Sequence, residues 1–344
     1  MTNAKKGGLS LGWLLPFFIV ALIFAGYSVY WFYMRGELEK SVRSWIDAER
    51  AAGATVEYQS LDLRGYPYRF ALHVDQPVYG DGRSTVWSAE TLQLVIQPWN
   101  WNHMIARSPG QSTLDLGGVR FRAALGPKSA GSLSWNEDGL RRLSLALDEA
   151  RIVNQDGEAL TASGFEFHAR PPADDPNALQ IVLQWEALTL PAVPADVDFL
   201  GQGLQPSRLL IEVPEAYPVI ASGGNLRNWV NRGGSINVAQ LLLNWGPLKF
   251  GATADLSLDS TGYVDGGVDV RIDDSDDLKA AISGSELAAS MDDEQLAGLL
   301  NGVSILGEVS KDGGFLPLSV RDGQIRYLGQ ELPGGIAIPP VPLD

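Results

Sequence analysis

The stretch LQIVLQWEA at residues 179–187 decides the fold class. Apolar side chains take every second position from Leu179 to Ala187, which is the period of a β-strand with one buried face. The opposite face is only partly polar, because it combines glutamine and glutamate side chains with Val182 and Leu188. This stretch therefore predicts a strand in a sheet.

The same two-residue alternation recurs on both sides of this strand. Further strands are predicted at residues 68–75, 92–96, 119–125, 143–147, 165–169, 248–258, 264–272, 316–320 and 325–328. Turn-forming clusters separate them, and successive strands joined by short turns pair antiparallel. The chain is therefore predicted to be mainly β. We expect antiparallel meandering sheets that form a groove, a sandwich or a roll, with a few short helices packed on them.

Residues 9–34, LSLGWLLPFFIVALIFAGYSVYWFYM, form an uncharged apolar stretch. About 20 apolar residues span the hydrocarbon core of a bilayer, so this stretch is long enough to cross with some tilt. Trp13 at one end and the aromatic residues of 27–33 at the other are typical of the interfacial belts of a membrane helix. A cleaved signal peptide has a shorter apolar core followed by an A-x-A-like site, which this sequence lacks. We expect one uncleaved transmembrane anchor.

Charge predicts the orientation and excludes one class of partner. Lys5 and Lys6 precede the anchor with no acidic residue beside them, whereas basic and acidic residues are mixed after it. The chain beyond residue 34 has 24 basic and 41 acidic side chains, a formal net charge of −17. Such a domain is repelled by nucleic acid. We expect a single-pass protein of the inner (cytoplasmic) membrane, with a cytoplasmic N-terminus, a periplasmic soluble domain and no nucleic-acid partner.

Changes of period along the chain predict its organisation. The predicted parts are a cytoplasmic tail (1–8), the transmembrane anchor (9–34), an amphipathic helix (35–53), a β-rich half (54–190), an irregular connection (191–235), a second β-rich half with two helices (236–330) and a Pro-rich tail (331–344). The tail is expected to be extended and poorly ordered. One face of the helix at 35–53 is apolar and should pack on the first sheet. This face carries Leu38, Val42, Trp45 and Ile46.

Helix-capping residues mark three shorter helices. One is predicted at residues 225–231, inside the irregular connection. Ser275 is expected to cap the next helix, whose first turn carries two aspartates. Asp292 and Gln295 resemble a capping box for the last helix. Its apolar face carries Leu296, Leu299, Leu300 and Val303.

The search for catalytic or metal-binding chemistry finds no site. The chain has no cysteine, and its three histidines, His73, His103 and His168, are not spaced to share a metal. The GLSLG match around Ser10 lies at the membrane boundary, outside the strand–turn–helix context of a nucleophile elbow. The acidic run 273–277 lacks the glycine and distal glutamate of a calcium loop. We therefore expect no enzyme, no cofactor, and no catalytic or metal residues.

The aromatic run PWNWNHM at residues 98–104 is the most unusual local feature. Trp99 and Trp101 would point to the same side if the run were extended. We interpret them as core residues. A membrane-surface contact and the wall of a ligand site are the alternatives.

Three segments carry a family resemblance: YQSLDLRGYPYRFALHVDQP at 58–77, WGPLKFGATADLSLDSTGYVDGGVDVRI at 245–272 and LPLSVRDGQIRYLG at 316–329. Together they resemble domain of unknown function 2125, a family of membrane-anchored bacterial envelope proteins. More loosely, the chain is similar to AsmA-like envelope proteins, and that resemblance implies a β-groove that holds lipid. It implies no functional residues at named positions.

Two functional hypotheses follow. The first is a membrane-tethered periplasmic module that binds or transfers lipid or another hydrophobic ligand along the apolar strand faces. The second is a structural or interaction protein of the cell envelope, with those faces packed together and an envelope protein as partner. Alternation alone does not separate them, since an apolar face has the same pattern whether it contacts side chains or acyl chains.

Overall fold

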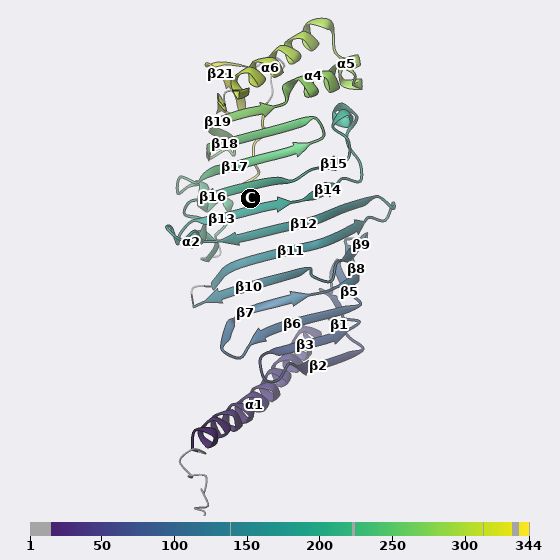
Figure 1. Ribbon diagram of the computed structural model, residues 1–344, viewed down its shortest axis with the longest axis vertical. Helices are drawn as coiled ribbons and strands as arrows, with labels where there is room; N and C mark the ends of the chain where they lie inside the picture. Colours follow the sequence, from purple (N-terminus) through teal and green to yellow (C-terminus); the bar gives the residue numbers. More distant parts are fainter. Residues whose placement is uncertain (1–14, 138, 222–223, 312, 332–336, 344) are drawn as a thin grey trace, which may run out of the picture.

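The computed structural model describes residues 15–137, 139–221, 224–311, 313–331 and 337–343. The predicted segment 1–8, the first residues of the anchor with Trp13, and the GLSLG match around Ser10 lie outside this part of the chain. The mainly β prediction is confirmed, because 22 described strands form one antiparallel sheet. Figure 1 shows these strands lying across a long molecule, with helix α1 at one end and helices α4 to α6 at the other.

The strands are β1 (Thr55–Glu57), β2 (Ser60–Arg64), β3 (Phe70–Asp75), β4 (Val78–Gly80), β5 (Thr85–Ala89), β6 (Thr91–Gln97), β7 (Asn100–Arg107), β8 (Gly110–Leu116), β9 (Val119–Leu125), β10 (Ala130–Asn136), β11 (Gly139–Val153), β12 (Ala159–Arg170), β13 (Leu179–Trp185), β14 (Ala187–Thr189), β15 (Gly203–Leu204), β16 (Ser207–Val213), β17 (Ser235–Trp245), β18 (Leu248–Leu258), β19 (Val264–Asp273), β20 (Leu316–Arg321), β21 (Gln324–Tyr327) and β22 (Gln330–Glu331). The helices are α1 (Leu15–Ala51), α2 (Ala216–Ala221), α3 (Leu226–Val230), α4 (Ser275–Ser283), α5 (Glu286–Ser290) and α6 (Asp293–Lys311), with a 3₁₀ segment η2 (Ala195–Leu200).

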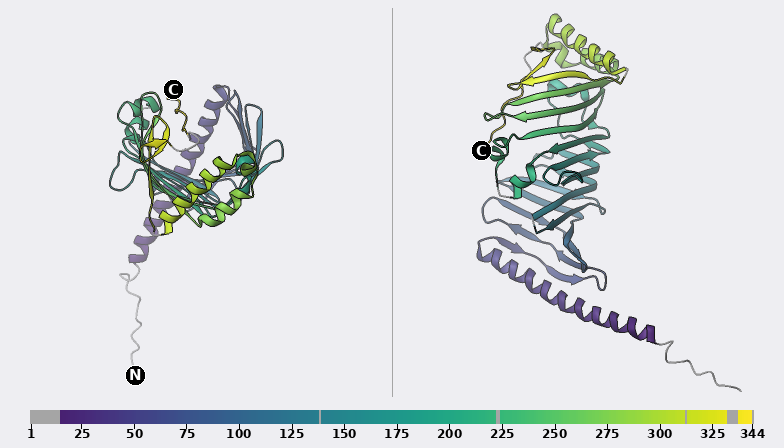
Figure 2. Two further views of the ribbon diagram at one scale, coloured as in Figure 1. Left: turned by 90° about the horizontal axis from the view of Figure 1, so that it is seen from above. Right: turned by 90° about the vertical axis from the view of Figure 1, so that its left-hand side faces the viewer.

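The long strands β11 and β12 each change partner part-way along their length. The first half of β11 pairs with β10 and its end pairs with β9, while β12 pairs with β14 and then with β13. The change occurs where the β11–β12 ladder skips Asp148 and Gly164, and Gly164 has φ +57. We call this line the crease. On its two sides the sheet rises as two walls, so the molecule seen along its axis is an open trough (Figure 2).

Helix α1 continues without a break from the apolar stretch into the predicted amphipathic helix, and Gly53 follows it with φ +93. A left-handed glycine just after a helix is a common way to end it. Ile46 is buried, and Trp45 stacks on Tyr79 of β4 with ring centroids 6.4 Å apart. The expected packing of this helix on the first sheet is therefore confirmed.

The predicted irregular connection at 191–235 contains a strand that joins the two β-rich halves. Strand β16 pairs with β13 on one side and with β17 on the other, so the sheet runs through this region. The sequence pattern did not predict β16, because its apolar run is short and the residues around it are rich in Pro and Gly. The expected helix at 225–231 is present as α3, and the Asn225 side chain caps it by accepting a hydrogen bond from the Asn228 amide.

The capping prediction is wrong for α4 and confirmed for α6. Asp274, with φ +53, precedes α4, and Ser275 is the first helical residue. Its hydroxyl instead faces α6, where a Cβ added at Gly307 would lie 2.0 Å from it. At α6, the Asp292 carboxylate accepts from the Gln295 amide at 2.8 Å, and the Gln295 side chain accepts from the Asp292 amide at 3.2 Å.

The end of the chain is held by the sheet rather than loose. The Ile338 and Val341 amides donate to the carbonyls of Gly323 and Gly262. Leu343 is buried with Val219, Trp229 and Val230 in one of the hydrophobic clusters. The expectation of a poorly ordered tail is therefore wrong for residues 337–343, because backbone hydrogen bonds to two turns of the sheet and the burial of Leu343 together hold this segment.

Candidate functional site: an apolar trough

Residue pairing across the sheet brings apolar side chains onto one face along its whole length. Directly opposed residues of antiparallel strands point to the same side. One row of such residues runs through Leu63, Leu72, Leu94, Ala106, Gly131, Leu145, Phe167, Leu183, Leu209, Leu241, Ala252, Val270 and Leu316. A second runs through Phe70, Ile96, Met104, Leu133, Leu143, Ala169, Ile181, Ile211, Val238, Ala254, Val268 and Leu318. No charged residue interrupts either row.

The opposite face of the same strands is mixed and carries polar networks. On β12 and β13, Glu166 accepts a hydrogen bond from Gln184 at 2.8 Å and lies 3.2 Å from the His168 ring. Gln180 donates to Glu212 of β16 at 2.9 Å. We call the apolar side the inner face and this side the outer face. The C-terminal segment, which packs on the inner face through Leu343, lies between the two walls in Figure 2.

Helices cover the two ends of the inner face and leave its middle open. Near the N-terminus, Trp31 of α1 is buried against Leu63 and Phe70. At the far end, Leu306 and Val309 of α6 pack over the cluster formed by Ala252, Val270 and Leu316. Between them, α2, α3 and Leu343 pack on one edge of the inner face, at Val213, Ile236 and Leu258. The members of the two rows on β10 to β13 and β16 stay half-buried and belong to none of the described buried clusters. These middle residues include Leu145, Phe167, Leu183 and Leu209.

The inner face leads into an apolar chamber beside α1. The chamber has a volume of about 470 Å³ and lies between the two walls, with α1 along one side. Leu72 and Leu94 of the first inner row line it, so the chamber and the trough share one surface. Its other apolar lining residues are Val42, Trp45, Ile46, Val56, Leu61, Val74, Pro77, Val78, Trp87 and Leu92. A volume of this size, lined in this way, suits an apolar ligand.

One polar lining group of the chamber, the Tyr79 hydroxyl, is bonded to the helix. The Tyr79 hydroxyl donates to Glu49 of α1 at 3.2 Å, and the negative charge of Glu49 raises the pKa of Tyr79. Together with the Trp45–Tyr79 stack, this contact joins the helix to the β4 wall. The chamber therefore offers a mainly apolar contact area for a ligand.

The turn between β2 and β3 fastens the sheet to the apolar part of α1. Tyr66 hydrogen bonds with Ser28 at 2.6 Å, and the Tyr27 hydroxyl donates to the Pro67 carbonyl. Trp31 stacks on Phe70 with centroids 5.1 Å apart. Tyr27, Trp31 and Phe32, which stacks on Tyr66, therefore contact this turn or the strand after it, whereas Tyr33 remains exposed.

A scan against protein families supplies the classification of the chain. The family described as "uncharacterized protein conserved in bacteria (DUF2125)" matches residues 31–333. The chain belongs to this family. No curated protein and no solved structure matches it. The matched range begins at Trp31, so this DUF2125 region starts where α1 meets the sheet. The chain also contains one helix, α1, that is long and apolar enough to cross a membrane and is almost wholly unburied over that span.

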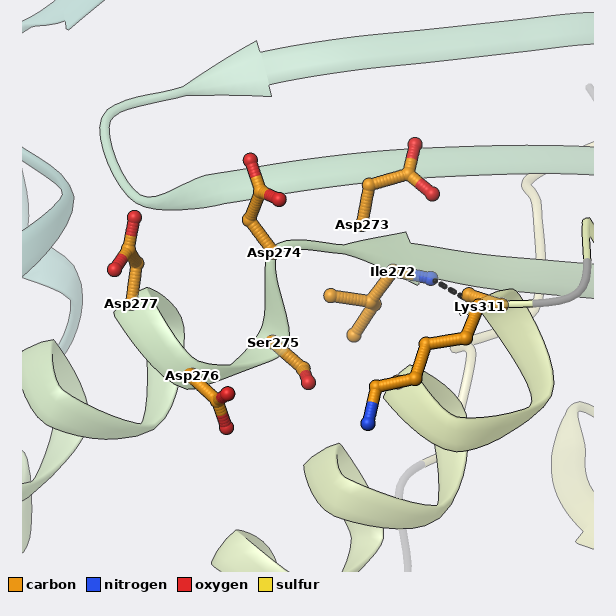
Figure 3. A pocket seen from close by; sticks show the side chains of 9 residues that line it. Ile272, Asp273, Asp274, Ser275, Asp276, Asp277 and Lys311 are labelled. Carbon is orange, nitrogen blue, oxygen red and sulfur yellow. Dashed lines mark hydrogen bonds between the residues drawn. The ribbon is translucent and has the colours of Figure 1, made fainter.

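Other polar groups of the DUF2125 domain serve the fold. A cleft of about 500 Å³ forms around the start of α4, lined by the aspartates of the acidic run and by Lys311 (Figure 3). Asp276 pairs with Lys279 at 2.7 Å, and its pKa is lowered by that hydrogen bond. Asp274 pairs with Lys249. These carboxylates are neutralised by lysines, consistent with the structural interpretation of the run.

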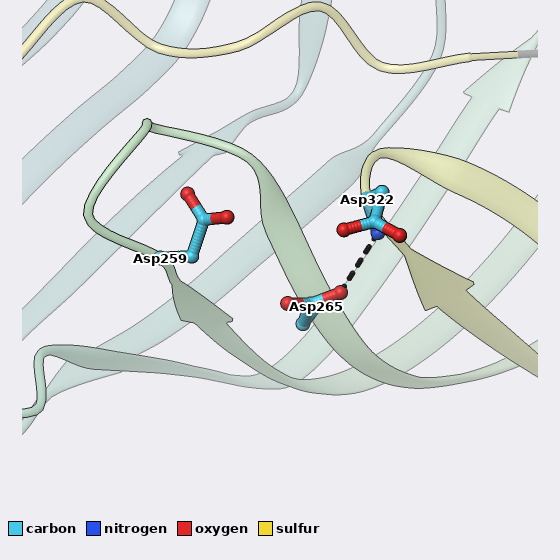
Figure 4. A group of neighbouring side chains, drawn as sticks. All are labelled: Asp259, Asp265 and Asp322. Carbon is cyan, nitrogen blue, oxygen red and sulfur yellow. Dashed lines mark hydrogen bonds between the residues drawn. The ribbon is translucent and has the colours of Figure 1, made fainter.

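Three further carboxylates, those of Asp259, Asp265 and Asp322, have oxygens within 4.8 Å of one another (Figure 4). Asp259 accepts bonds from the amides of Thr261 and Tyr263 and from the Thr261 hydroxyl, and these bonds lower its pKa. Asp265 accepts from the Asp322 amide at 2.8 Å. The cluster closes two neighbouring turns. Sequence reasoning missed this grouping because 63 positions separate its first and last members.

The predicted aromatic run and the histidines are separated by the fold. Trp101 packs on Phe70 at 5.4 Å, as expected for a core residue, but Trp99 lies in the β6–β7 turn and is 63 % exposed. The two tryptophans therefore do not point to the same side, because Trp99 lies in the turn where the chain reverses direction. His73 contacts Gln93 and His168 contacts Glu166, while His103 lines a separate outer cleft.

Proposed function

We propose that the trough binds lipid or another hydrophobic ligand and that α1 tethers it to the inner membrane. In this arrangement the N-terminus is cytoplasmic and the trough is periplasmic. The observation that carries the proposal is the middle of the inner face, where the two apolar rows are only half-buried because α1 and α6 cover the ends and α2 and α3 pack at one edge. A soluble domain rarely leaves such a large apolar surface without an occupant.

Energetics favour a chain-like ligand. Each methylene removed from water contributes about 0.8 kcal/mol, and the inner rows offer apolar contact along the whole trough. The chamber lies beside α1, which places the start of this surface near the bilayer if α1 spans it. No polar group is required for such binding, in keeping with the absence of a predicted catalytic or cofactor residue.

A photo-crosslinking experiment tests the proposal on the full chain in bacterial membranes. A photoreactive amino acid replaces Leu183 of the inner face or, as the matched control, its neighbour Val182 of the outer face. Both positions are half-buried on β13 and differ only in the side to which they point. We expect mass spectrometry to find lipid-sized adducts at position 183 and far fewer at position 182.

The alternative function, a scaffold without a small-molecule ligand, gives a different result. It predicts protein–protein adducts, or adducts within the chain, at position 183 and no lipid mass. Equal lipid adducts at both positions would also overturn the proposal, since they would indicate unspecific contact with detergent or bilayer. A second comparison, Leu183→Glu against Val182→Glu, should abolish lipid co-purification only for the inner-face change.

A further inference from the structure

We infer that a cationic and aromatic cleft on the outer face, beside the point where α1 leaves the apolar stretch, binds a phosphate group at the bilayer surface. The cleft has a volume of about 260 Å³ and lies over β6 and β7. Val95 and Ile105, which pair across these strands, form its floor. Its rim carries Tyr68, Arg69, Trp99, His103 and Arg107.

The charges around this cleft have no protein partner. Three basic side chains line it, and none of its described lining residues is acidic. Two arginines beside the same turn are paired: Arg64 and Arg35 lie 2.6 and 3.7 Å from Asp62. Among the described residues, the guanidinium groups of Arg69 and Arg107 form no ion pair or side-chain hydrogen bond. In a domain with a net charge of −17, unpaired arginines that converge on one cleft indicate an anionic ligand.

The chemistry of the rim suits phosphate. A guanidinium group offers planar N–H donors that match two phosphate oxygens, and such charge-assisted bonds are shorter and stronger than neutral ones. Tyr68 and Trp99 are 73 % and 63 % exposed beside these donors. Amphipathic rings of this kind are enriched where lipid headgroups meet the hydrocarbon core.

The position of the cleft beside the apolar stretch of α1 points to a lipid headgroup as the source of the phosphate. Tyr68 follows the turn that contacts the helix through Tyr66 and Pro67. Tyr66 also lies edge-on to Phe24, with centroids 6.2 Å apart, well inside the apolar stretch. The rim of the cleft is thus two residues from a contact with the membrane-spanning part of α1. The inference depends on α1 crossing a bilayer and does not require that the trough binds a ligand.

The test titrates the purified full chain in detergent micelles with dioleoylphosphatidylglycerol and counts retained lipids by native mass spectrometry. The variant Arg69→Gln/Arg107→Gln removes both guanidinium groups, which are exposed and so not needed for folding. The control Arg142→Gln/Arg170→Gln removes two exposed arginines of β11 and β12, with the same change of charge. We expect at least about tenfold weaker retention for the cleft variant only, the effect of losing charge-assisted hydrogen bonds.

Two further probes identify the ligand group. Dioleoylglycerol has the same acyl chains but no phosphate. Its retention should therefore be the same for wild type and the cleft variant. If millimolar inorganic phosphate displaces the lipid, the cleft recognises the phosphate group. If inorganic phosphate binds but lipid retention is the same for wild type and the cleft variant, the ligand is the free anion. Equal loss in the cleft and control variants would overturn the inference. Leu183→Glu should leave this retention unchanged, so failure of the trough proposal and failure of the cleft are distinguishable.

Discussion

Replacing Trp31 with alanine should detach the sheet from the helix that carries it. Trp31 is 1 % exposed, stacks on Phe70 and lies edge-on to Tyr66 with centroids 5.3 Å apart. A buried tryptophan removes about 150–250 Å² from water, which corresponds to roughly 4–6 kcal/mol at 25 cal/mol per Å². Among the described residues, the buried Trp31 Nε1 finds no hydrogen-bond partner, and this offsets about 1–3 kcal/mol. We therefore expect Trp31→Ala to cost about 3 kcal/mol, near the low end for such substitutions.

Hydrogen–deuterium exchange of the full chain in nanodiscs measures this loss locally. A cost of about 3 kcal/mol raises the population of the detached state by roughly 100-fold, so amides of β2 and β3 should exchange faster by that factor. Tyr33→Ala is the control, because Tyr33 lies on the same helix and is 65 % exposed. If exchange in β2 and β3 is no faster for Trp31→Ala than for Tyr33→Ala, the assigned role of Trp31 is refuted.

Two further predictions concern the crease and the response to acid. Gly164→Ala should lower the thermal unfolding temperature more than Gly157→Ala. Both glycines have positive φ, where a side chain costs about 1 kcal/mol. Of the two positions, only Gly164 would bring the added Cβ against another group, the Glu186 side chain at 2.5 Å. Equal shifts would contradict the close approach at the crease. The Ser129 hydroxyl lowers the pKa of Asp148, so this carboxylate contributes stability above its unfolded pKa and loses that contribution as the pH falls through the folded pKa. Urea midpoints of Asp148→Asn and wild type should therefore differ near neutral pH and approach each other as the pH falls through the lowered folded pKa of Asp148, and a constant difference would exclude the linkage.

The trough shows how one alternating sheet can provide both a packed core and the proposed ligand-binding surface. A closed sandwich would bury both inner rows against a second layer. Here the strands fold along the crease, α1 and α6 reach only the ends, and α2 and α3 pack only at one edge. The same inner face therefore provides a core near α1 and α6 and an open surface between them. This is the feature that the proposed crosslinking experiment examines.

Several parts of the protein follow from local sequence. Alternation in residues 179–187 predicts β13, an uncharged run predicts α1, and the Asp292–Gln295 pair predicts the start of α6. Each depends on interactions between residues that are close in the chain: side-chain period, uninterrupted apolarity and capping hydrogen bonds. Such signals can be read without knowing what the segment packs against.

Other features exist only in the tertiary structure. Alternation shows that β13 has an apolar face but not that Leu183 lies in an open trough, because exposure depends on the curvature of the whole sheet. Trp99 and Trp101 are neighbours in sequence, yet a reversal of the chain places one outside and the other in the core. Arg69 and Arg107 meet at one cleft because β3, β6 and β7 pair side by side. Sequence determined the strongly alternating strands, the long apolar helix α1 and the start of α6; strand pairing over long separations decided which faces remain open and which charges converge.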